Sequence, residues 1–233
     1  MTETKRIIAN GHYKIENASV KLDKRRLVVA PKHAVKFDFD DISQPFATES
    51  SVGRTPCRIR LLQCDCLEAA ELLKAEHGTM PLVLDFASGS NPGGGVKRNQ
   101  QGTQEEDICR RSSLLPSLEQ QDYPLPSMGG IYAPDICVFR GPGRSGYPLL
   151  KEPFWIAILA AEMPNLAEIG KKERIFIQGK IQGVLHMALR HGHSSLVLGA
   201  WGCGAFGNDA RTMAAIFKDQ GFDIFRPHVC FKH

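Results

Sequence analysis

The sequence predicts a three-layer α/β domain with a mixed or largely parallel central sheet. From about residue 58 onward, short apolar runs alternate with longer segments of helical periodicity, a pattern typical of strands covered by helices. The chain has 233 residues, of which 42% are hydrophobic and 23% charged, enough for one sizeable core. We expect a single domain over residues 1–233, with residues 1–53 as an accessory segment and residues 54–233 as the core.

The accessory segment is expected to contribute edge structure. Two alternating runs, residues 13–22 and 27–30, are separated by four charged residues and predict a hairpin or edge strands. Residues 37–51 are acidic and polar, so we expect them to form an exposed connection.

The core segment predicts strands and helices in alternation. Asp65 and Glu68 have the spacing of a capping box before a helix that runs through Leu73. The expected strands and extended segments are residues 58–63, 82–86, 131–139, 174–178, 195–199 and 222–231. The other expected helices are residues 104–118, 154–163, 181–190 and 209–217, and residues 141–148 are expected to form a loop.

Composition argues against several classes of protein. No apolar run approaches the roughly 20 residues of a membrane-spanning helix, and the first residues lack the apolar core of a secretory signal. The seven cysteines include no C-x-x-C pair, which favours reduced thiols and a cytoplasmic protein without a metal site. A net charge of +4 is compatible with an anionic substrate but too small to indicate sequence-specific nucleic-acid binding. We expect a monomer that needs no cofactor.

A glycine-rich segment followed by two carboxylates is the most informative feature. Residues 91–107 read NPGGGVKRNQQGTQEED. Glycines let a ligand approach the main chain closely. Glu105 and Glu106 provide an acid or base and a group that binds hydroxyls. Because neighbouring helix residues point about 100° apart, the two carboxylates cannot both face one atom, which favours a division of roles.

A purely structural interpretation competes with this one. Thr103 and Glu106 form T-x-x-E before an apolar periodic run, which is a capping box. That interpretation accounts for Glu106 but not for the glycine triplet, the Asn91-Pro92 turn or Glu105. The whole pattern therefore favours a ligand site.

A second glycine loop, residues 199–207, reads GAWGCGAFG between an expected strand and an expected helix. Gly202, Gly204 and Gly207 fit the dinucleotide pattern G-x-G-x-x-G, but that pattern should open a fold, and here only 26 residues follow. Backbone N–H groups at a helix start nevertheless suit a pyrophosphate. The aromatic faces of Trp201 and Phe206 are expected to suit a ribose or a base.

These loops, together with the stretches IYAPDICVF and VLGAWGCGAFGN, resemble the microbial type of poly(ADP-ribose) glycohydrolase, from about residue 58 to the C-terminus. The resemblance implies a macrodomain-like fold with Glu106 as the catalytic acid and Glu105 as its partner on the ribose hydroxyls. The implied contacts to the distal ribose and its surroundings are Asn91, Gly93, Gly94, Gly95, Val96 and Gln104. The implied contacts to the diphosphate are Gly202, Cys203, Gly204, Ala205 and Phe206.

The activity implied by the resemblance is exo-acting hydrolysis of ribose–ribose O-glycosidic bonds, which releases ADP-ribose. The expected partners are ADP-ribose and poly(ADP-ribose) on modified macromolecules, without membrane association. Two alternatives remain open: an ADP-ribose reader without turnover, and a hydrolase of another ADP-ribosyl linkage. Binding alone does not require two carboxylates, which argues against a reader.

Overall fold

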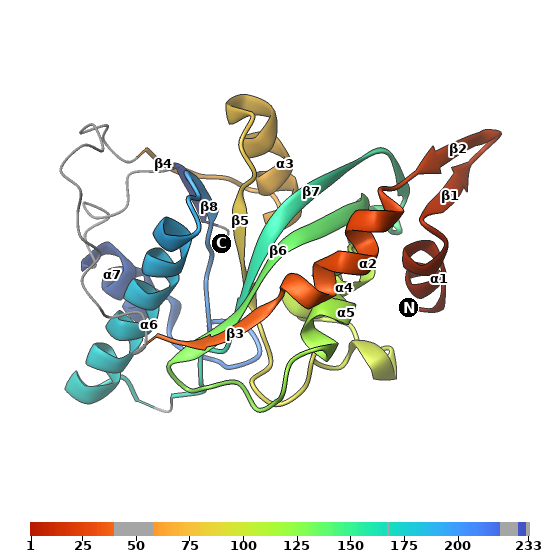
Figure 1. Ribbon diagram of the computed structural model, residues 1–233. Helices are drawn as coiled ribbons and strands as arrows, with labels where there is room; N and C mark the ends of the chain where they lie inside the picture. Colours follow the sequence, from red (N-terminus) through yellow and green to blue (C-terminus); the bar gives the residue numbers. More distant parts are fainter. Residues whose placement is uncertain (40–57, 167, 220–227, 232–233) are drawn as a thin grey trace. The chain divides into compact units, whose positions relative to one another are not determined.

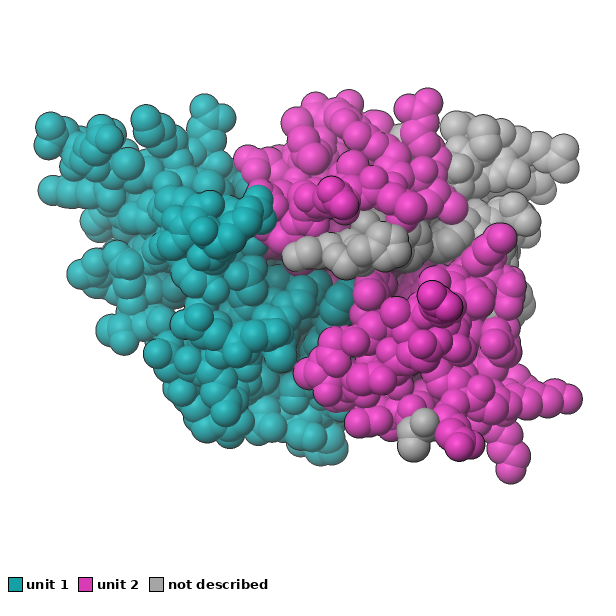
Figure 2. All heavy atoms as spheres, turned by 180° about the vertical axis from the view of Figure 1, so that it is seen from behind, with its two compact units in different colours: residues 1–36, 85–125, 131–162 teal, residues 37–84, 126–130, 163–233 magenta. Residues whose placement is uncertain are grey.

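The structure is a computed structural model that describes residues 1–39, 58–166, 168–219 and 228–231 (Figure 1). Its packing divides the chain into two compact units, coloured separately in Figure 2. Unit 1 comprises Met1–Lys36, Asp85–Leu125 and Ile131–Glu162, and unit 2 comprises Phe37–Leu84, Pro126–Gly130 and Met163–His233. The single domain expected over residues 1–233 stays a prediction.

Unit 1 contains Glu105 and Glu106, the two carboxylates that follow the first glycine loop, and most of the N-terminal segment. Its elements are α1 (Thr2–Asn10), β1 (His12–Ile15), β2 (Ala18–Lys21), α2 (Lys24–His33), α4 (Gln104–Arg111), α5 (Leu114–Glu119), most of β6 (Gly129–Arg140) and β7 (Leu149–Ala161). Strands β6 and β7 pair antiparallel, with Ile136 opposite Ile156 and Ala133 opposite Ile158. These four side chains are fully or almost fully buried, so this ladder is part of the hydrophobic core.

Unit 2 is built on parallel strands. Its elements are β4 (Ile59–Leu61), α3 (Cys66–His77), α6 (Lys171–Arg190), β8 (Ser195–Val197), α7 (Ala210–Asp219) and β9 (His228–Phe231). The first residues of β5 (Leu82–Phe86) pair parallel with β8, which pairs parallel with β9, which pairs parallel with β4. Parallel and antiparallel pairs therefore occur together, and the prediction of a mixed α/β fold is confirmed.

Several predicted elements are confirmed almost to the residue. Strand β5 has the predicted bounds, and β4, β6 and β8 lie within one to three residues of theirs. Helix α3 begins with the predicted capping box, in which Asp65 accepts hydrogen bonds from Leu67 and Glu68 while the Glu68 carboxylate accepts from Asp65 N. Local signals decided these elements because each is bounded by turn or capping residues.

Two predictions in the second half of the chain are wrong. Residues 154–163, predicted as a helix, mostly belong to strand β7. This strand is buried along most of its length, so it lacks the alternation that distinguishes a strand from a buried helix. Residues 174–178, predicted as a strand, are helical, because α6 runs without a break from Lys171 to Arg190. Helix α6 is still not a membrane span: no helix among the described residues is both long and apolar enough for one.

The N-terminal half contains further corrections. Residues 27–30 are helical and belong to α2, whose first turn is capped by Asp23; Leu27 and Ala30 are buried at helical spacing. The region predicted as one helix over residues 104–118 is split into α4 and α5 at Ser112 and Ser113. The predicted connection over 37–51 begins inside strand β3 (Val35–Asp38), and its residues 40–51 lie outside the described part of the chain, as do residues 222–227 of the predicted terminal segment.

Candidate active site

The first glycine loop joins the end of β5 to the start of α4. The predicted capping box is present at that start: Thr103 Oγ1 accepts a hydrogen bond from Glu106 N at 3.4 Å, and Glu106 Oε2 accepts one from Thr103 N at 3.3 Å. The interpretation of Glu106 as part of a capping box is therefore confirmed. The capping box uses only one of the two oxygens of the Glu106 carboxylate, Oε2.

Both carboxylates also bind the main chain of the glycine loop. Glu106 Oε1 accepts a hydrogen bond from Gly95 N at 3.0 Å. Glu105 Oε1 accepts one from Gly93 N at 2.9 Å, and its Oε2 accepts one from Ser88 N at 2.8 Å. A Cβ atom at Gly95 would lie only 2.6 Å from Glu106 Oε1, so glycine is required there for the carboxylate to approach the backbone.

The loop's own amide groups are occupied. Gly94 N donates to Asn91 O at 3.0 Å, and Val96 N donates to Gly93 O at 3.1 Å. Gln104 belongs to the same framework, because its Oε1 accepts a hydrogen bond from Phe86 N at 2.7 Å. The first loop thus uses its N–H groups to hold two carboxylates in fixed positions, rather than leaving them to a ligand.

A third carboxylate, Asp85, was missed by the sequence reasoning. It lies in β5, is fully buried, and neither of its oxygens has a hydrogen-bond partner among the described residues. Burial raises the pKa of Asp85 well above its ordinary range, and the charge of Glu105 raises it further. A signal was present in the sequence, because an Asp in an otherwise apolar strand must be buried.

Burial also raises the pKa of Glu105, to about 8, against the opposing effect of the hydrogen bonds from Ser88 and Gly93. The side chain is 1% exposed. Tyr123 belongs to the same electrostatic cluster: burial raises the pKa of its hydroxyl, and Glu105 and Asp85 raise it further. Its hydroxyl has no hydrogen-bond partner among the residues described. The cluster therefore holds protons that solvent-exposed carboxyls would lose at neutral pH.

The second glycine loop, in unit 2, has the opposite hydrogen-bonding pattern. Gly207 N donates to Gly204 O at 2.9 Å, and Asn208 N donates to Gly202 O at 3.0 Å, which closes the turn. Within this turn, the backbone N–H groups of residues 204–206 donate no hydrogen bond to any described residue. These residues are exposed or half-buried. Successive unpaired N–H groups form a site suited to an anion.

The fold itself accounts for only part of this loop's glycine content. Gly202 has a φ of +81°, and a Cβ atom there would lie 2.6 Å from the Asn208 side chain, so glycine is required. At Gly204 the φ is not positive, and a Cβ atom would meet nothing within 4 Å. The turn therefore does not need glycine at position 204.

Trp201 supports the second loop from inside. It is fully buried, so the expectation that its face stacks on a ribose or a base is wrong; Phe206, which is half-buried, keeps that possibility. The Nζ atom of Lys180 lies 5.6 Å from the centre of the Trp201 ring and donates a hydrogen bond to Ser127 O. A cation at this distance attracts the ring face, so Lys180 helps to fix the start of the loop.

The structure assigns the predicted site residues to two groups. In unit 1 it brings Gly93, Gly95, Glu105 and Glu106 into direct hydrogen-bonding contact, with Gln104, Asn91, Gly94 and Val96 in the same framework. Unit 2 holds the other predicted set, Gly202, Cys203, Gly204, Ala205 and Phe206. Among the described residues, no group of three or more His, Cys, Asp and Glu side chains could hold a metal ion.

Comparison with known proteins places these features in a family. The family model for the catalytic domain of microbial-type PARG matches residues 1–141. The match extends upstream of residue 58, so it includes the N-terminal segment as well as the first glycine loop. No curated protein sequence matches at a significant level.

Solved structures of poly(ADP-ribose) glycohydrolases are similar over most of the chain. The Thermomonospora curvata enzyme bound to the inhibitor ADP-HPD is 30% identical, with 99% of this chain and 90% of that chain covered and a TM-score of 0.84. The Deinococcus radiodurans enzyme in complex with ADP-ribose is 26% identical, with 91% and 90% covered and a TM-score of 0.72. A family match over more than half of the chain, with this structural likeness, shows that the chain belongs to the microbial-type PARG catalytic-domain family.

Proposed function

We propose that this protein is an exo-acting poly(ADP-ribose) glycohydrolase, which hydrolyses ribose–ribose O-glycosidic bonds and releases ADP-ribose. One observation carries the proposal above all: two adjacent helix-start carboxylates are each fixed by an N–H group of the same glycine loop, Glu105 by Gly93 and Glu106 by Gly95. Family membership supports the reaction, and this arrangement supports the proposed roles of the two glutamates.

The proposed chemistry divides the work between the two glutamates. Glycoside hydrolysis passes through an oxocarbenium-like state that forms more easily when the leaving oxygen is protonated and water is then activated. Glu106 is proposed as the proton-transfer group and Glu105 as its partner on the ribose hydroxyls. The hydrogen bonds from the loop fix both carboxylates before substrate arrives, which removes the cost of orienting them during the reaction.

The two glycine loops are proposed to have different tasks. Asn91, Gly93, Gly94, Gly95, Val96 and Gln104 are proposed to form the surroundings of the distal ribose, with the carboxylates and not the occupied amides as the polar contacts. The second loop, Gly202, Cys203, Gly204, Ala205 and Phe206, is proposed to bind the diphosphate. Its unpaired N–H groups at residues 204–206 support this assignment.

The decisive experiment is incubation of the protein with poly(ADP-ribose) and with mono-ADP-ribosylated protein, followed by chromatography of the products. Release of free ADP-ribose from the polymer is expected. Single ADP-ribose units should accumulate from the start of the reaction, because an exo-acting enzyme removes them from the chain end one at a time. Binding without product would instead indicate a reader, and release from the mono-modified protein alone would indicate a hydrolase of another ADP-ribosyl linkage.

We further propose that the protein acts as a cytoplasmic monomer on ADP-ribosylated macromolecules, without a cofactor, membrane association or sequence-specific nucleic-acid binding. The free thiols of Cys109, Cys137 and Cys203 support a reducing compartment. Light scattering of the purified protein tests the oligomeric state, and cell fractionation tests the location.

A further inference from the structure

The charges of the chain are unevenly distributed. Residues 1–36 contain nine lysine and arginine residues and three acidic residues, a formal net charge of +6. The whole chain has 29 basic and 25 acidic residues, so residues 37–233 carry a formal net charge of −2. The basic segment lies wholly within unit 1, which also contains Glu105 and Glu106.

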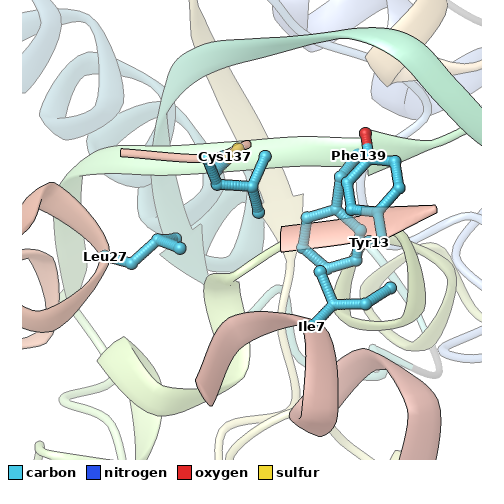
Figure 3. Close-up of a cluster of buried hydrophobic side chains, with 6 residues drawn as sticks. Ile7, Tyr13, Leu27, Cys137 and Phe139 are labelled. Atoms are coloured by element: carbon cyan, nitrogen blue, oxygen red, sulfur yellow. The ribbon is translucent and has the colours of Figure 1, made fainter. Parts of the chain in front are cut away.

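The β1–β2 hairpin of this segment is firmly anchored through one face. Tyr13 is buried in a cluster with Ile7, Leu27, Cys137 and Phe139 (Figure 3). Leu22 belongs to the same cluster, and Ile15 and Val20 pack against it. The Tyr13 hydroxyl donates a hydrogen bond to Leu150 O at 2.6 Å. Because side chains alternate along a strand, this packing fixes which residues face outward.

Several exposed side chains of the hairpin are basic. In the antiparallel register His12 lies opposite Lys21 and Lys14 lies opposite Ser19, and all four residues are exposed. Lys24, the first residue of α2, lies near the base of the hairpin, because a Cβ atom at Gly11, the residue before β1, would be 2.9 Å from Lys24 Cβ. We refer to His12, Lys14, Lys21 and Lys24 as the basic face.

The lysines of the basic face are not held in ion pairs. Within the part of the chain that the structure describes, none of its three lysines forms an ion pair. Two acidic residues lie nearby in the sequence: Asp23 caps α2, where it accepts a hydrogen bond from Arg26 N, and Glu16 is exposed in the turn of the hairpin. Cationic side chains gathered on a rigid surface repel one another, and a bound polyanion relieves that repulsion.

The segment that carries this face also contacts the catalytic helix. Thr4 Oγ1 in α1 donates a hydrogen bond to Arg110 O near the C-terminal end of α4 at 2.9 Å. Helix α4 has eight residues, so its two ends are about 12 Å apart. Thr4, which belongs to the same segment as the basic face but not to the face itself, is therefore about one short helix away from the end of α4 that presents Glu105 and Glu106.

We propose that the basic face is a second binding surface for poly(ADP-ribose), which holds phosphates of the polymer beyond the unit that is being cleaved. The proposal rests on the proposed function, because it takes the polymer as the substrate. Each ADP-ribose unit carries a diphosphate, so a long chain offers regularly spaced negative charges, whereas free ADP-ribose offers only the pair that occupies the catalytic site. The basic face therefore raises affinity for long chains and leaves affinity for the single unit unchanged.

The test compares two triple variants with equal loss of charge. The first, Lys14→Gln/Lys21→Gln/Lys24→Gln, neutralises the three lysines of the basic face. The second, Lys171→Gln/Lys172→Gln/Lys218→Gln, neutralises three exposed lysines of unit 2. Both are placed in a Glu106→Gln background, which is expected to slow cleavage, and binding of long poly(ADP-ribose) chains is measured by fluorescence anisotropy over a range of salt concentrations.

The basic-face variant is expected to bind long polymer about tenfold more weakly. Its slope of log affinity against log salt should be shallower by about 2, since each phosphate contact contributes about 0.7 for a single-stranded polyanion. Affinity for free ADP-ribose, measured by calorimetry, should stay within twofold, and the unit 2 variant should bind polymer normally. Equal weakening in both variants would overturn the proposal in favour of diffuse charge attraction, as would no weakening in either.

Two further measurements distinguish polymer binding by the basic face from nucleic-acid binding and from failure of the proposed function. A single-stranded oligonucleotide of matched charge should bind more weakly than the polymer; tighter binding that depends on the same three lysines would replace the polymer with a nucleic acid as the partner. Hydrolysis is measured separately on the chain with Glu106 intact. Absence of product with intact, lysine-dependent polymer binding would refute the proposed function and leave the basic face as a polymer-binding surface.

Discussion

The Oε1 atom of Glu106 accepts a hydrogen bond from the main-chain N–H of Gly95 at 3.0 Å, eleven residues earlier in the chain. With the adjacent bond from Gly93 N to Glu105, it joins the glycine loop and the start of α4 into one hydrogen-bonded framework. Glycine is required at position 95 because the carboxylate comes too close for a Cβ atom. The glycine loop and the two carboxylates therefore form one structural unit.

Replacement of Glu106 by Gln tests whether this carboxylate takes part in catalysis. If Glu106 transfers the proton, Glu106→Gln should lower turnover of poly(ADP-ribose) by about 100-fold or more, while calorimetry should show ADP-ribose affinity within a few-fold of normal. Unchanged turnover would leave Glu106 with its capping role alone.

A matched control separates capping from catalysis. Thr103→Ala breaks the other half of the capping box and should lower the free energy of unfolding by about 1 kcal/mol. Turnover of this variant should remain within a few-fold of the unmodified protein. An equally large loss of turnover in Thr103→Ala would show that the helix start, not the carboxyl chemistry of Glu106, controls the rate.

The raised pKa of Glu105 predicts a pH dependence of stability. Burial raises that pKa from 4.5 to about 8, so the folded protein binds more protons than the unfolded chain between these values. Stability from this group is therefore fully present below pH 4.5 and is lost as the pH rises through about 8, with a slope of up to about 1.4 kcal/mol per pH unit. The raised pKa of Asp85 acts in the same direction.

Urea unfolding of the protein and of its Glu105→Gln variant at several pH values between pH 5 and pH 9 measures this slope. Glu105→Gln cannot ionise, so its unfolding free energy should fall less steeply with rising pH. Parallel curves for the two proteins would mean that Glu105 does not hold its proton in the folded state.

The second glycine loop is tested by Gly204→Val. A side chain fits at this position without a clash, so circular dichroism should show a folded protein. Its β-branched side chain should obstruct approach to the neighbouring N–H groups and weaken ADP-ribose binding severely. Adenosine, which lacks the diphosphate, should bind poorly even to the unmodified protein.

Ala200→Val is the control in the same loop, since Ala200 is exposed and precedes the unpaired N–H groups. It should bind ADP-ribose normally. A folded Gly204→Val protein with normal ADP-ribose affinity would show that the diphosphate is bound elsewhere.

Independence from metal ions is expected because the sequence shows no cluster of ligand side chains. Hydrolysis of polymer should continue in excess EDTA without added divalent ions. Loss of activity in EDTA that magnesium or zinc restores would point instead to a metal-dependent ADP-ribosyl hydrolase.

Local sequence determined those features that depend on neighbours along the chain. The capping boxes at Asp65 and Thr103 are both present, because the residues that form them lie within one helical turn. The pattern of three glycines followed by Gln104, Glu105 and Glu106 identified the segment that holds the carboxylates, and the family match supports the interpretation drawn from it.

Tertiary structure decided what local pattern could not. Residues 154–161 are a strand because β6 offers them an antiparallel partner, and burial on both faces removes the alternation by which a strand is recognised. Trp201 is buried, with Lys180 near its ring, and is therefore not available for stacking on a ligand. Asp85 acquires its raised pKa only through burial and the approach of Glu105, twenty residues away. Burial and distant charges depend on which segments the fold brings together, so the sequence predicted the candidate site residues and the fold determined their electrostatics.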